Sequence, residues 1–384
     1  MPPELPARAE VVVIGGGVVG TSAAFHLAEA GVDVLLLERD ELASGSTSRA
    51  AGGVRAQFSD PVNIALGQRS LAAFERFAQR PGGEIDLKQC GYLFLLDSED
   101  DVADFQRGVA LQNELGVPSR LLDVAEACAM SPFVNSDGLL AAAFSPRDGH
   151  CTPEAVVAGY AAGARAHGAV IRRHCPVTGI DVLDGAITGV RTASGVVATE
   201  TVICAAGAWS AAIGELVGVT LPVRPLRRQV LVSEPVPDLP ADLPFTIDFG
   251  TTFYFHDEGD GLLMGMSDPD EEYGFRLERS DAWLGRFSEV VAHRAPRLAE
   301  VGIARGWAGL YEMTPDHNAV VGESAAVSRF LYATGFSGHG FLQGPAIGEV
   351  LRDLVLGHTP VVDVSALDVA RFADQRPRPE RNCV

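Results

Sequence analysis

The stretch Glu10-Val-Val-Val-Ile-Gly15-Gly-Gly-Val-Val-Gly20 decides the fold of the N-terminal part of the chain. Its run of β-branched residues, 11–14, is typical of a short, buried parallel strand. The glycines at 15, 17 and 20 allow, in turn, a tight turn after the strand, close approach of the backbone to a ligand, and close packing of helix on strand. An apolar helical pattern then continues to Gly31. The sequence therefore predicts the first strand and helix of a dinucleotide-binding βαβ unit.

The second strand of this unit is predicted at residues 34–37, and Glu38 follows it, 18 residues after Gly20. A carboxylate at this place commonly binds the ribose hydroxyls of a dinucleotide. The pyrophosphate is expected at the helix N-terminus, at Val18 and Val19, because free backbone N–H groups and the helix dipole favour an anion there. Arg39, beside the carboxylate, belongs to the same predicted site.

Length and charge restrict the class of protein. The chain has 384 residues, 47% of them hydrophobic, which is enough for two structural lobes. A formal net charge of −20 would repel a phosphate backbone, so we expect no nucleic-acid partner. The N-terminal residues do not resemble a signal peptide, and no stretch reaches the ~18 apolar residues of a membrane helix, so we expect a cytoplasmic protein. The six cysteines form no CxxC pair, and no metal site is predicted.

Two further glycine-containing segments point to a flavin. The segment Thr201-Val-Ile-Cys-Ala-Ala-Gly-Ala-Trp-Ser210 is a hydrophobic strand that runs into a turn of small residues, similar to the second strand-to-loop motif of two-domain FAD proteins; the alternative is one more core strand. The segment Tyr332-Ala-Thr-Gly-Phe-Ser-Gly-His-Gly-Phe341 opens a helix, and its N–H groups would stabilise negative charge on a reduced isoalloxazine. His339 lies in this segment and is predicted to contact the flavin; the alternative is an ordinary core histidine.

These segments resemble a known family. GGGVVG (15–20), GWAGLYEMTPD (306–316) and ATGFSGHGF (333–341) occur in the order found in the D-amino-acid oxidase superfamily, and most nearly in its glycine oxidase, sarcosine oxidase and amino-acid dehydrogenase branch. GSTSRAAGGVRAQF (45–58) resembles the flavin-edge loop of the β-type subunits of sarcosine oxidases and proline dehydrogenases. The resemblance runs nearly the whole chain. It implies non-covalent or covalent FAD and oxidation of a C–H bond next to a primary or secondary amine.

The predicted fold is α/β (α+β overall), with a Rossmann-type FAD-binding domain and a second, mainly antiparallel β substrate domain. We expect the FAD-binding domain to be discontinuous, over residues 1–90, 146–220 and 301–384, and the substrate domain to comprise 91–145 and 221–300. Beyond the residues already named, the predicted FAD contacts are Ser46, Thr47, Ser48, Arg49, Gly52, Gly53, Val177, Ala206, Gly207, Trp209, Gly335, Gly338, His339, Gly340, Phe341 and Leu342.

Three departures from the monomeric sarcosine oxidases affect the chemistry. Gly309 stands where those proteins attach FAD through a cysteine, so we expect non-covalent FAD. The strand comparable to the one that carries their oxygen-activating lysine, residues 262–265, has none, and Lys88 is the only lysine of the chain. The histidine used elsewhere near the Arg49 loop is also missing. An electron acceptor other than oxygen, such as another protein or a quinone, is therefore an alternative to O₂.

Four residues are candidates for the catalytic site. Arg55 is placed beside the flavin by its motif and could bind a substrate carboxylate; the alternative is a surface salt bridge. Tyr254 and Tyr311 fit the walls of an apolar pocket, although ordinary core tyrosines would show the same pattern. His339 is the fourth. Arg224, Arg227 and Arg228 form a basic cluster that is interpreted as a solvated strand edge rather than a docking patch.

The sequence therefore predicts an FAD-dependent enzyme that oxidises a small amino acid or N-alkyl amino acid by hydride transfer, with an imine as the first product. One alternative is a 2-hydroxy acid dehydrogenase of the same superfamily. The other is a flavin-binding subunit of a larger dehydrogenase complex. The formation of an oligomer is compatible with the sequence.

Overall fold

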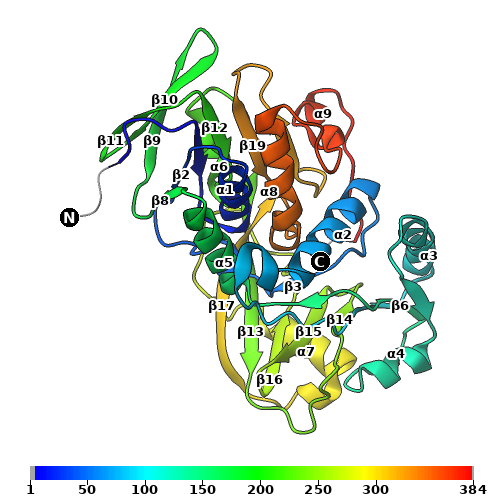
Figure 1. Cartoon of the computed structure of the whole chain (residues 1–384). Coiled ribbons are helices and arrows are strands. Elements are labelled where there is room, and N and C mark those ends of the chain that lie inside the picture. The colour runs from blue at the N-terminus through cyan, green and yellow to red at the C-terminus, as the bar shows by residue number, and fades with distance from the viewer. Residues whose placement is uncertain (1–4, 383–384) are drawn as a thin grey trace.

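A computed structural model describes residues 5–382, and its upper half in Figure 1 is built on a six-stranded sheet with the order β18-β19-β12-β1-β2-β8. Strand β1 (Val11–Ile14) pairs in parallel with β2 (Val34–Leu37) and with β12 (Thr201–Cys204). The edges are β8 (Val170–Arg172), which is parallel, and β18 (Val320–Glu323), which is antiparallel to β19 (Phe330–Thr334). All four residues of β1 are buried, as expected of a strand covered on both faces.

Helices cover one face of this sheet. α1 (Val18–Glu29) packs between α8 (Gly340–Leu356) and α5 (Pro153–Ala166), and α2 (Pro61–Glu75) packs on the other side of α8 (Figure 1). A Cβ at Gly344 would lie 2.6 Å from a Val18 methyl group, and one at Gly348 would lie 2.1 Å from the Ser22 hydroxyl. These two glycines, four residues apart on one face of α8, let the first and last long helices of the domain pack closely.

The lower half is an eight-stranded sheet with the order β17-β13-β16-β15-β14-β4-β6-β5 (Figure 1). All neighbouring pairs are antiparallel except β14 with β4. One face packs against α7 (Leu284–Arg294) and α4 (Val124–Met130), through apolar residues such as Phe253, Phe255 and Phe287. The strands are β4 (Tyr92–Leu96), β5 (Arg120–Leu122), β6 (Ala141–Ser145), β13 (Arg224–Ser233), β14 (Phe245–Asp248), β15 (Phe253–Glu258), β16 (Gly261–Gly265) and β17 (Ile303–Met313).

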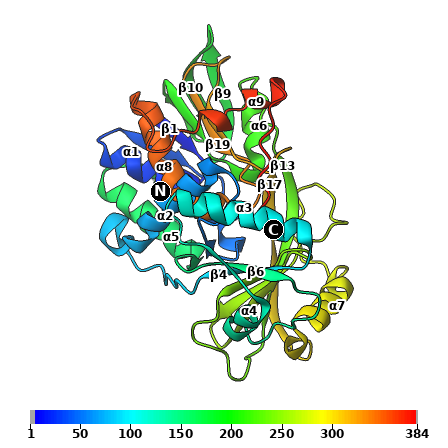
Figure 2. The same ribbon diagram turned by 90° about the vertical axis from the view of Figure 1, so that its right-hand side faces the viewer.

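The remaining elements are smaller. α3 (Glu99–Glu114) crosses the side of the molecule (Figure 2), and its first turn holds three acidic residues after the Ser98 cap, as a helix dipole favours. A three-stranded antiparallel sheet, with its tight turn at Asp184-Gly185, projects at the top of Figure 1. It consists of β9 (Val177–Leu183), β10 (Ala186–Thr192) and β11 (Gly195–Ala198), and the other elements are β3 (Gly53–Val54), β7 (Gly149–His150), α6 (Ser210–Glu215) and α9 (Ala370–Ala373).

The two predicted lobes are present as a mixed α/β part and a mainly antiparallel part. β17 lies at the edge of the eight-stranded sheet, whereas the predicted division places residues 303–313 with the FAD-binding part. This difference arises because β13 and β17 form one long antiparallel pair that runs from one lobe to the other. The exact domain boundaries stay a prediction.

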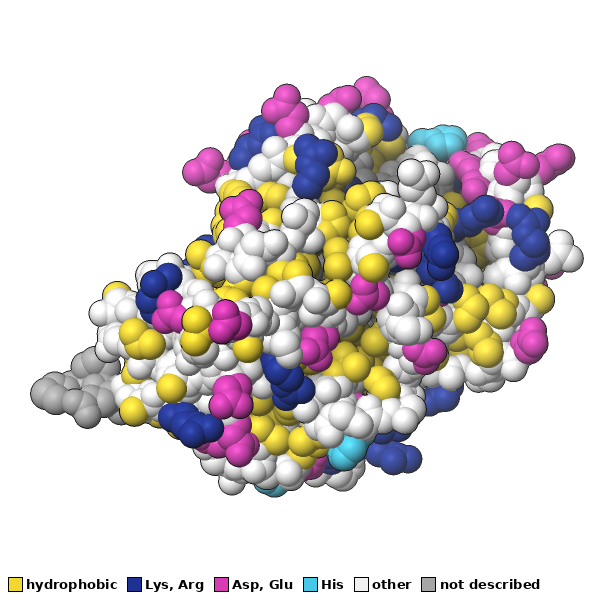
Figure 3. Space-filling model, turned by 90° about the horizontal axis from the view of Figure 1, so that it is seen from above, with side chains coloured by type: hydrophobic (Ala, Val, Ile, Leu, Met, Phe, Trp, Pro, Cys, Tyr) yellow, Lys and Arg dark blue, Asp and Glu magenta, His cyan; other side chains and the backbone are white. Residues whose placement is uncertain are grey.

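The top face of the molecule carries acidic and basic side chains in an interspersed arrangement (Figure 3). On that face the positive charge is not gathered into a continuous stripe of the kind that follows a nucleic-acid backbone. Within residues 5–382, none of the helices combines the length and the apolar character needed to cross a membrane.

Candidate active site

A cavity of about 740 Å³ lies where the carboxyl ends of β1, β2 and β12 meet one face of the eight-stranded sheet. The carboxyl ends of parallel strands are the usual ligand-binding edge of such a sheet. The cavity is lined by Gly15–Val19 after β1, by Glu38 and Arg39 after β2, and, after β12, by Ala205, Ala206, Gly207 and Trp209. The glycine-rich segment at the N-terminus of α8, Gly338–Leu342, lines another side of the cavity. The cavity therefore joins the predicted dinucleotide site to the sheet of the second lobe.

The fingerprint glycines have the three roles expected of them. A Cβ at Gly20 would lie 2.0 Å from the carbonyl oxygen of Gly15, so this position must be glycine for α1 to pack on β1. Gly17 has an extended backbone (φ −78°, ψ −173°), and a Cβ there would meet only the Thr47 hydroxyl, at 3.1 Å. The space over Gly17 is thus open to a ligand. Glu38 accepts from the N–H of Gly16 at 2.7 Å and holds the loop in place.

Hydrogen bonds connect the loop over residues 44–53 to β17 and to β15. Ser46 donates to the carbonyl of Leu310 at 2.6 Å, and Arg49 donates to the carbonyl of Ala308 at 2.8 Å. The indole N–H of Trp307 donates in return to the Arg49 carbonyl, at 3.0 Å. A Cβ at Gly309 would lie 2.8 Å from the Cβ of Arg49, so the glycine lets this loop lie directly on the strand.

An aromatic surface on the eight-stranded sheet forms the floor of the cavity. Tyr92 and Phe245 stack with ring centroids 4.3 Å apart, and Tyr254 stacks on Phe245 at 5.6 Å. A Cβ at Gly265, the cross-strand partner of Tyr254, would lie 2.2 Å from the Tyr254 hydroxyl, so the tyrosine lies across the glycine. Burial raises the pKa of Tyr92 and of Tyr254 well above the ordinary value for tyrosine, so both hydroxyls stay protonated.

Arg55 and His339 contact each other at the end of the cavity. A guanidinium nitrogen of Arg55 lies 3.2 Å from Nε2 of His339, and because arginine only donates, this histidine nitrogen must accept. The proton of His339 is therefore on Nδ1. Burial and the Arg55 charge hold the pKa of His339 well below its ordinary value, so the ring is neutral. Arg55 also donates to the backbone carbonyls of Gln57 and Asn382, the latter at 2.5 Å, and it stacks on Phe58.

Glu312 is a buried carboxyl group that the sequence analysis did not single out. It lines the cavity and accepts from the Gly335 N–H at 3.0 Å and from the Thr334 hydroxyl at 2.9 Å. Burial outweighs these hydrogen bonds and raises the pKa of Glu312 to about 7. A single acidic residue in the otherwise apolar segment Gly309–Met313 was the available signal.

Most of the predicted site residues line this cavity. Arg55, Tyr254, Tyr311 and His339 all do, and so do all but three of the predicted FAD contacts. The three exceptions have other neighbours: Gly20 packs on Gly15, Gly335 donates to Glu312, and Ser48 lines a second cavity. The roles in catalysis or cofactor binding that the sequence predicts for all of these residues stay predictions.

The interpretation of the arginine cluster as a solvated strand edge is correct in its pairing and wrong in the solvation of Arg227 and Arg228. The half of β13 that carries Arg224, Arg227 and Arg228 pairs with β17, whereas β16 pairs with the other end of the strand, Val230–Val232. Arg224 is exposed, Arg227 forms an ion pair with the buried Glu271 at 2.7 Å, and Arg228 lines the cavity. The alternating pattern of a strand does not by itself show which side chains will pair with an acid or face a cavity, which is why the solvation of these arginines was misjudged.

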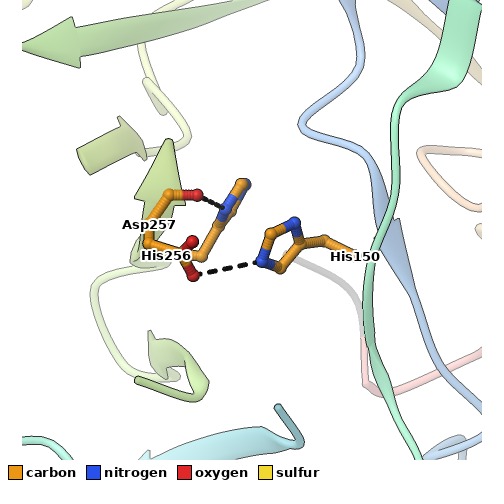
Figure 4. A group of neighbouring side chains, drawn as sticks. All are labelled: His150, His256 and Asp257. Carbon is orange, nitrogen blue, oxygen red and sulfur yellow. Dashed lines mark hydrogen bonds and ion pairs between the residues drawn. The ribbon is translucent and has the colours of Figure 1, made fainter. Parts of the chain in front are cut away.

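The second cavity, of about 520 Å³, lies on the other side of the loop over residues 48–51. His150, His256 and Asp257 lie at its wall with ligand-type atoms within 4.8 Å of one another (Figure 4). The ring nitrogens of His256 already contact the carbonyls of Asp257 and Ala51, at 2.7 and 2.9 Å. Asp257 is in turn paired with His150 and with Lys88. These contacts occupy the atoms that a metal ion would need, and the predicted absence of a metal site stays a prediction.

The main cavity fits an FAD molecule in its chemistry. Gly17 leaves open space for a phosphate at the N-terminus of α1, and Glu38 lies at the end of β2, where a carboxylate can bind a ribose. The segment Gly338–Leu342, at the N-terminus of α8, lines the cavity together with the aromatic floor. An extended ligand with a phosphate-rich centre and an aromatic end matches these surroundings.

Comparisons with known proteins agree with this geometry. The family model described as FAD dependent oxidoreductase matches residues 10–354. Mouse mitochondrial dimethylglycine dehydrogenase is 31% identical over 97% of this chain, which spans 45% of that protein. The crystal structure of L-proline dehydrogenase from P. horikoshii has a TM-score of 0.91, with 32% identity over 97% of this chain and 100% of that one. Glycine oxidase from Geobacillus kaustophilus has a TM-score of 0.85, with 26% identity over 95% and 99%.

The chain spans about half the length of the curated dehydrogenases that it matches, while it matches the two solved structures along almost their full length. The resemblance inferred from the motifs is confirmed by these comparisons, and so is the α/β fold. The chain belongs to the FAD dependent oxidoreductase family, and its cofactor is FAD.

Proposed function

We propose that this chain oxidises the C–H bond next to the amine of a small amino acid or N-alkyl amino acid. The substrate loses a hydride from carbon and a proton from nitrogen and becomes an imine, which water then hydrolyses to a carbonyl compound and ammonia or a smaller amine. Bound FAD would supply the two-electron acceptor for the hydride. The names of the similar proteins, which act on dimethylglycine, L-proline and glycine, support this class of substrate.

The observation that carries the proposal is the composition of the main cavity. Its dinucleotide end holds the open Gly17 cradle, and its other end holds an aromatic floor with the hydroxyls of Tyr254 and Tyr311. An ammonium group would lose its hydration among these rings, and burial raises the pKa of Glu312, a carboxyl group that lines the same cavity, to about 7, so this floor favours a neutral amine. A neutral amine is the form that can release a hydride from the neighbouring carbon.

The residues of the chain would orient the substrate rather than react with it. The aromatic floor would hold the substrate carbon against the cofactor and exclude water from it. We propose that the tyrosine hydroxyls, Arg55 and His339 shape the polar side of this pocket, and that the segments 46–53, 206–209 and 335–342 hold the cofactor. The discontinuous division into an FAD-binding and a substrate domain is part of the same proposal.

We propose an electron acceptor other than oxygen as the more effective one. Oxygen reduction is helped by a positive charge beside the cofactor. His339 is held neutral, the Arg55 guanidinium is already engaged by two backbone carbonyls and His339, and Lys88, the only lysine, lies at the second cavity in an ion pair with Asp257. A protein or quinone acceptor fits these surroundings.

The test is anaerobic bleaching of the FAD-loaded chain by a panel of amino acids and N-methyl amino acids, with matched 2-hydroxy acids as controls. We expect bleaching by at least one amine, and release of ammonia or a smaller amine during turnover with an artificial acceptor. Bleaching by hydroxy acids alone would replace the proposal with a 2-hydroxy acid dehydrogenase. No turnover with any artificial acceptor would favour a flavin-binding subunit that depends on a larger complex.

A further inference from the structure

Glu380 is buried beside the start of α2 and does not line the main cavity. Its side chain accepts hydrogen bonds at 2.6–3.2 Å from the backbone N–H groups of Ser59, Asp60 and Asn382, from the Ser59 hydroxyl and from the Asn63 amide. Free N–H groups at the N-terminus of a helix favour an anionic group there. This preference explains the contacts with residues 59 and 60, but not those with Asn63 and Asn382.

A first path of hydrogen bonds leads from Glu380 to Arg55. Glu380 accepts from the N–H of Asn382, and the carbonyl of Asn382 accepts from a terminal nitrogen of Arg55 at 2.5 Å. The same nitrogen of Arg55 lies 3.2 Å from Nε2 of His339. Its two hydrogens are therefore divided between the Asn382 carbonyl and the histidine ring, so the position of Asn382 determines how Arg55 meets His339.

A second path leads from Glu380 to His339. The amide nitrogen of Asn63 donates to Glu380, and the amide oxygen of Asn63 accepts from the Gln343 side chain at 3.0 Å. Gln343 lies in the first turn of α8, and its backbone N–H donates at 3.1 Å to the carbonyl of His339, the residue before the helix. Asn63 and Gln343 are each 1% exposed, so these bonds are shielded from solvent.

The contact between Arg55 and His339 fixes the tautomer of the histidine. Arginine only donates, so Nε2 of His339 accepts and Nδ1 carries the proton while Arg55 stays in this position. Both side chains line the cavity that fits FAD. A displacement of either one would therefore move a positive charge or a ring proton at the cavity wall.

We infer that Glu380 is a positioning residue that holds Arg55 and His339 against each other, through Asn382 and Asn63. This inference rests on the proposed function, in which Arg55 and His339 shape the polar side of the pocket. Glu380 acts only through these buried hydrogen bonds. Its removal would also leave N–H groups of residues 59 and 60 without their acceptor, and the test must separate that loss of stability from the loss of positioning.

The first test follows the His339 tautomer by nitrogen NMR in the FAD-loaded full chain with isotope-labelled histidine. Signals of His339 are assigned by their absence from His339→Gln. The amide nitrogen of glutamine cannot accept, so in Glu380→Gln one of the two paths must break. We expect the wild type to show one tautomer, with the proton on Nδ1, and Glu380→Gln to show a mixture of both tautomers.

Arg381→Met is the matched control for this substitution. Arg381 follows Glu380 in the chain, and its exposed side chain pairs with Asp104 at 2.7 Å, away from both paths. The control should show the wild-type tautomer.

The second test separates positioning from the stability of α2. The charge of Arg55 favours the negative charge of a reduced flavin, so Glu380→Gln should shift the reduction potential of bound FAD to a more negative value. In an Arg55→Met background the same substitution should leave the potential unchanged, because the charge that it displaces is gone. A loss of helix stability alone would act equally in both backgrounds.

Three results would overturn the inference. They are a wild-type His339 with its proton on Nε2, a single Nδ1 tautomer in Glu380→Gln, and a shift in potential of the same size with and without Arg55. If Glu380→Gln does not fold, Gln343→Met takes its place, because it breaks only the path to His339. A mixture of tautomers is expected there too, and an unchanged tautomer would contradict the inference.

The proposed function fails separately, because neither measurement needs an amine. If no amine bleaches the flavin while the His339 tautomer depends on Glu380, the positioning role stands and the amine oxidation does not. If amines bleach the flavin and the tautomer is independent of Glu380, only the positioning role is refuted.

Discussion

Replacing Gly17 by valine should remove FAD binding and leave the fold intact. A Cβ at Gly17 has a single neighbour within 4 Å, the Thr47 hydroxyl at 3.1 Å, and the backbone there is extended, so a side chain costs the empty chain little. In the loaded chain the same side chain would occupy the place of the pyrophosphate. If this overpacking costs about 3 kcal/mol, FAD affinity falls roughly a hundredfold.

The assay is thermal unfolding of FAD-free protein with and without added FAD. At an FAD concentration about 100 times the wild-type Kd, binding stabilises the folded chain by about 2.7 kcal/mol, and a hundredfold weaker affinity leaves about 0.4 kcal/mol. The Gly17→Val chain should therefore melt near the wild-type temperature without FAD and show almost no rise when FAD is added.

Gly20→Ala is the matched control, since its Cβ would lie 2.0 Å from the carbonyl oxygen of Gly15 inside the protein. It should lower the melting temperature of the empty chain itself, because helix and strand must move apart, at a cost of about 1–3 kcal/mol. A Gly17→Val chain that still gains the full wild-type rise in melting temperature from FAD would refute the assignment of this cradle. So would a variant that is as unstable without FAD as Gly20→Ala.

Three further outcomes are expected. Acid precipitation should release all FAD into the supernatant, because Gly309 offers no thiol; flavin fluorescence that stays with the denatured polypeptide would contradict this. The reduced chain should reoxidise slowly in air and rapidly with an artificial acceptor in stopped-flow mixing, because His339 carries no charge; reoxidation by oxygen at the rate of turnover would make the protein a true oxidase. Without FAD, Glu312 should contribute a fall in folding stability of roughly 3 kcal/mol as pH rises from 4.5 to about 7, because folded Glu312 keeps its proton over this range and unfolded Glu312 does not; in urea unfolding, Glu312→Gln should reduce the pH dependence by that amount and leave the contribution of buried Asp148, whose pKa is likewise raised to about 7.

The sequence predicted the local features of the fold well. The G-x-G-x-x-G unit with its two flanking strands depends on neighbouring residues, whose spacing and turn chemistry are visible in the sequence. The pairing of β12 between β1 and β19 is different, because it joins strands far apart in the chain. No periodicity specifies that order.

In the candidate site too, local features were predicted from the sequence and long-range contacts were not. The residues of the three glycine-containing segments lie around one cavity, as their motifs indicated. The contact of Arg55 with the Asn382 carbonyl spans 327 residues and changes what Arg55 can bind, and nothing near either residue announces it. Arg228 was misjudged for a related reason, since its environment is set by Gly309 on another strand.

The close packing of α1 against α8 has a consequence for how the protein is made. A ribosome completes α1, β1 and β12 long before β19 and α8, and at typical rates the interval is on the order of ten seconds. During that interval β12 presents an unpaired edge and α1 an uncovered apolar face, both of which invite association with other chains. Nascent chains should therefore be held by chaperones until residue 356 has emerged, and FAD should be taken up only after synthesis has passed that point.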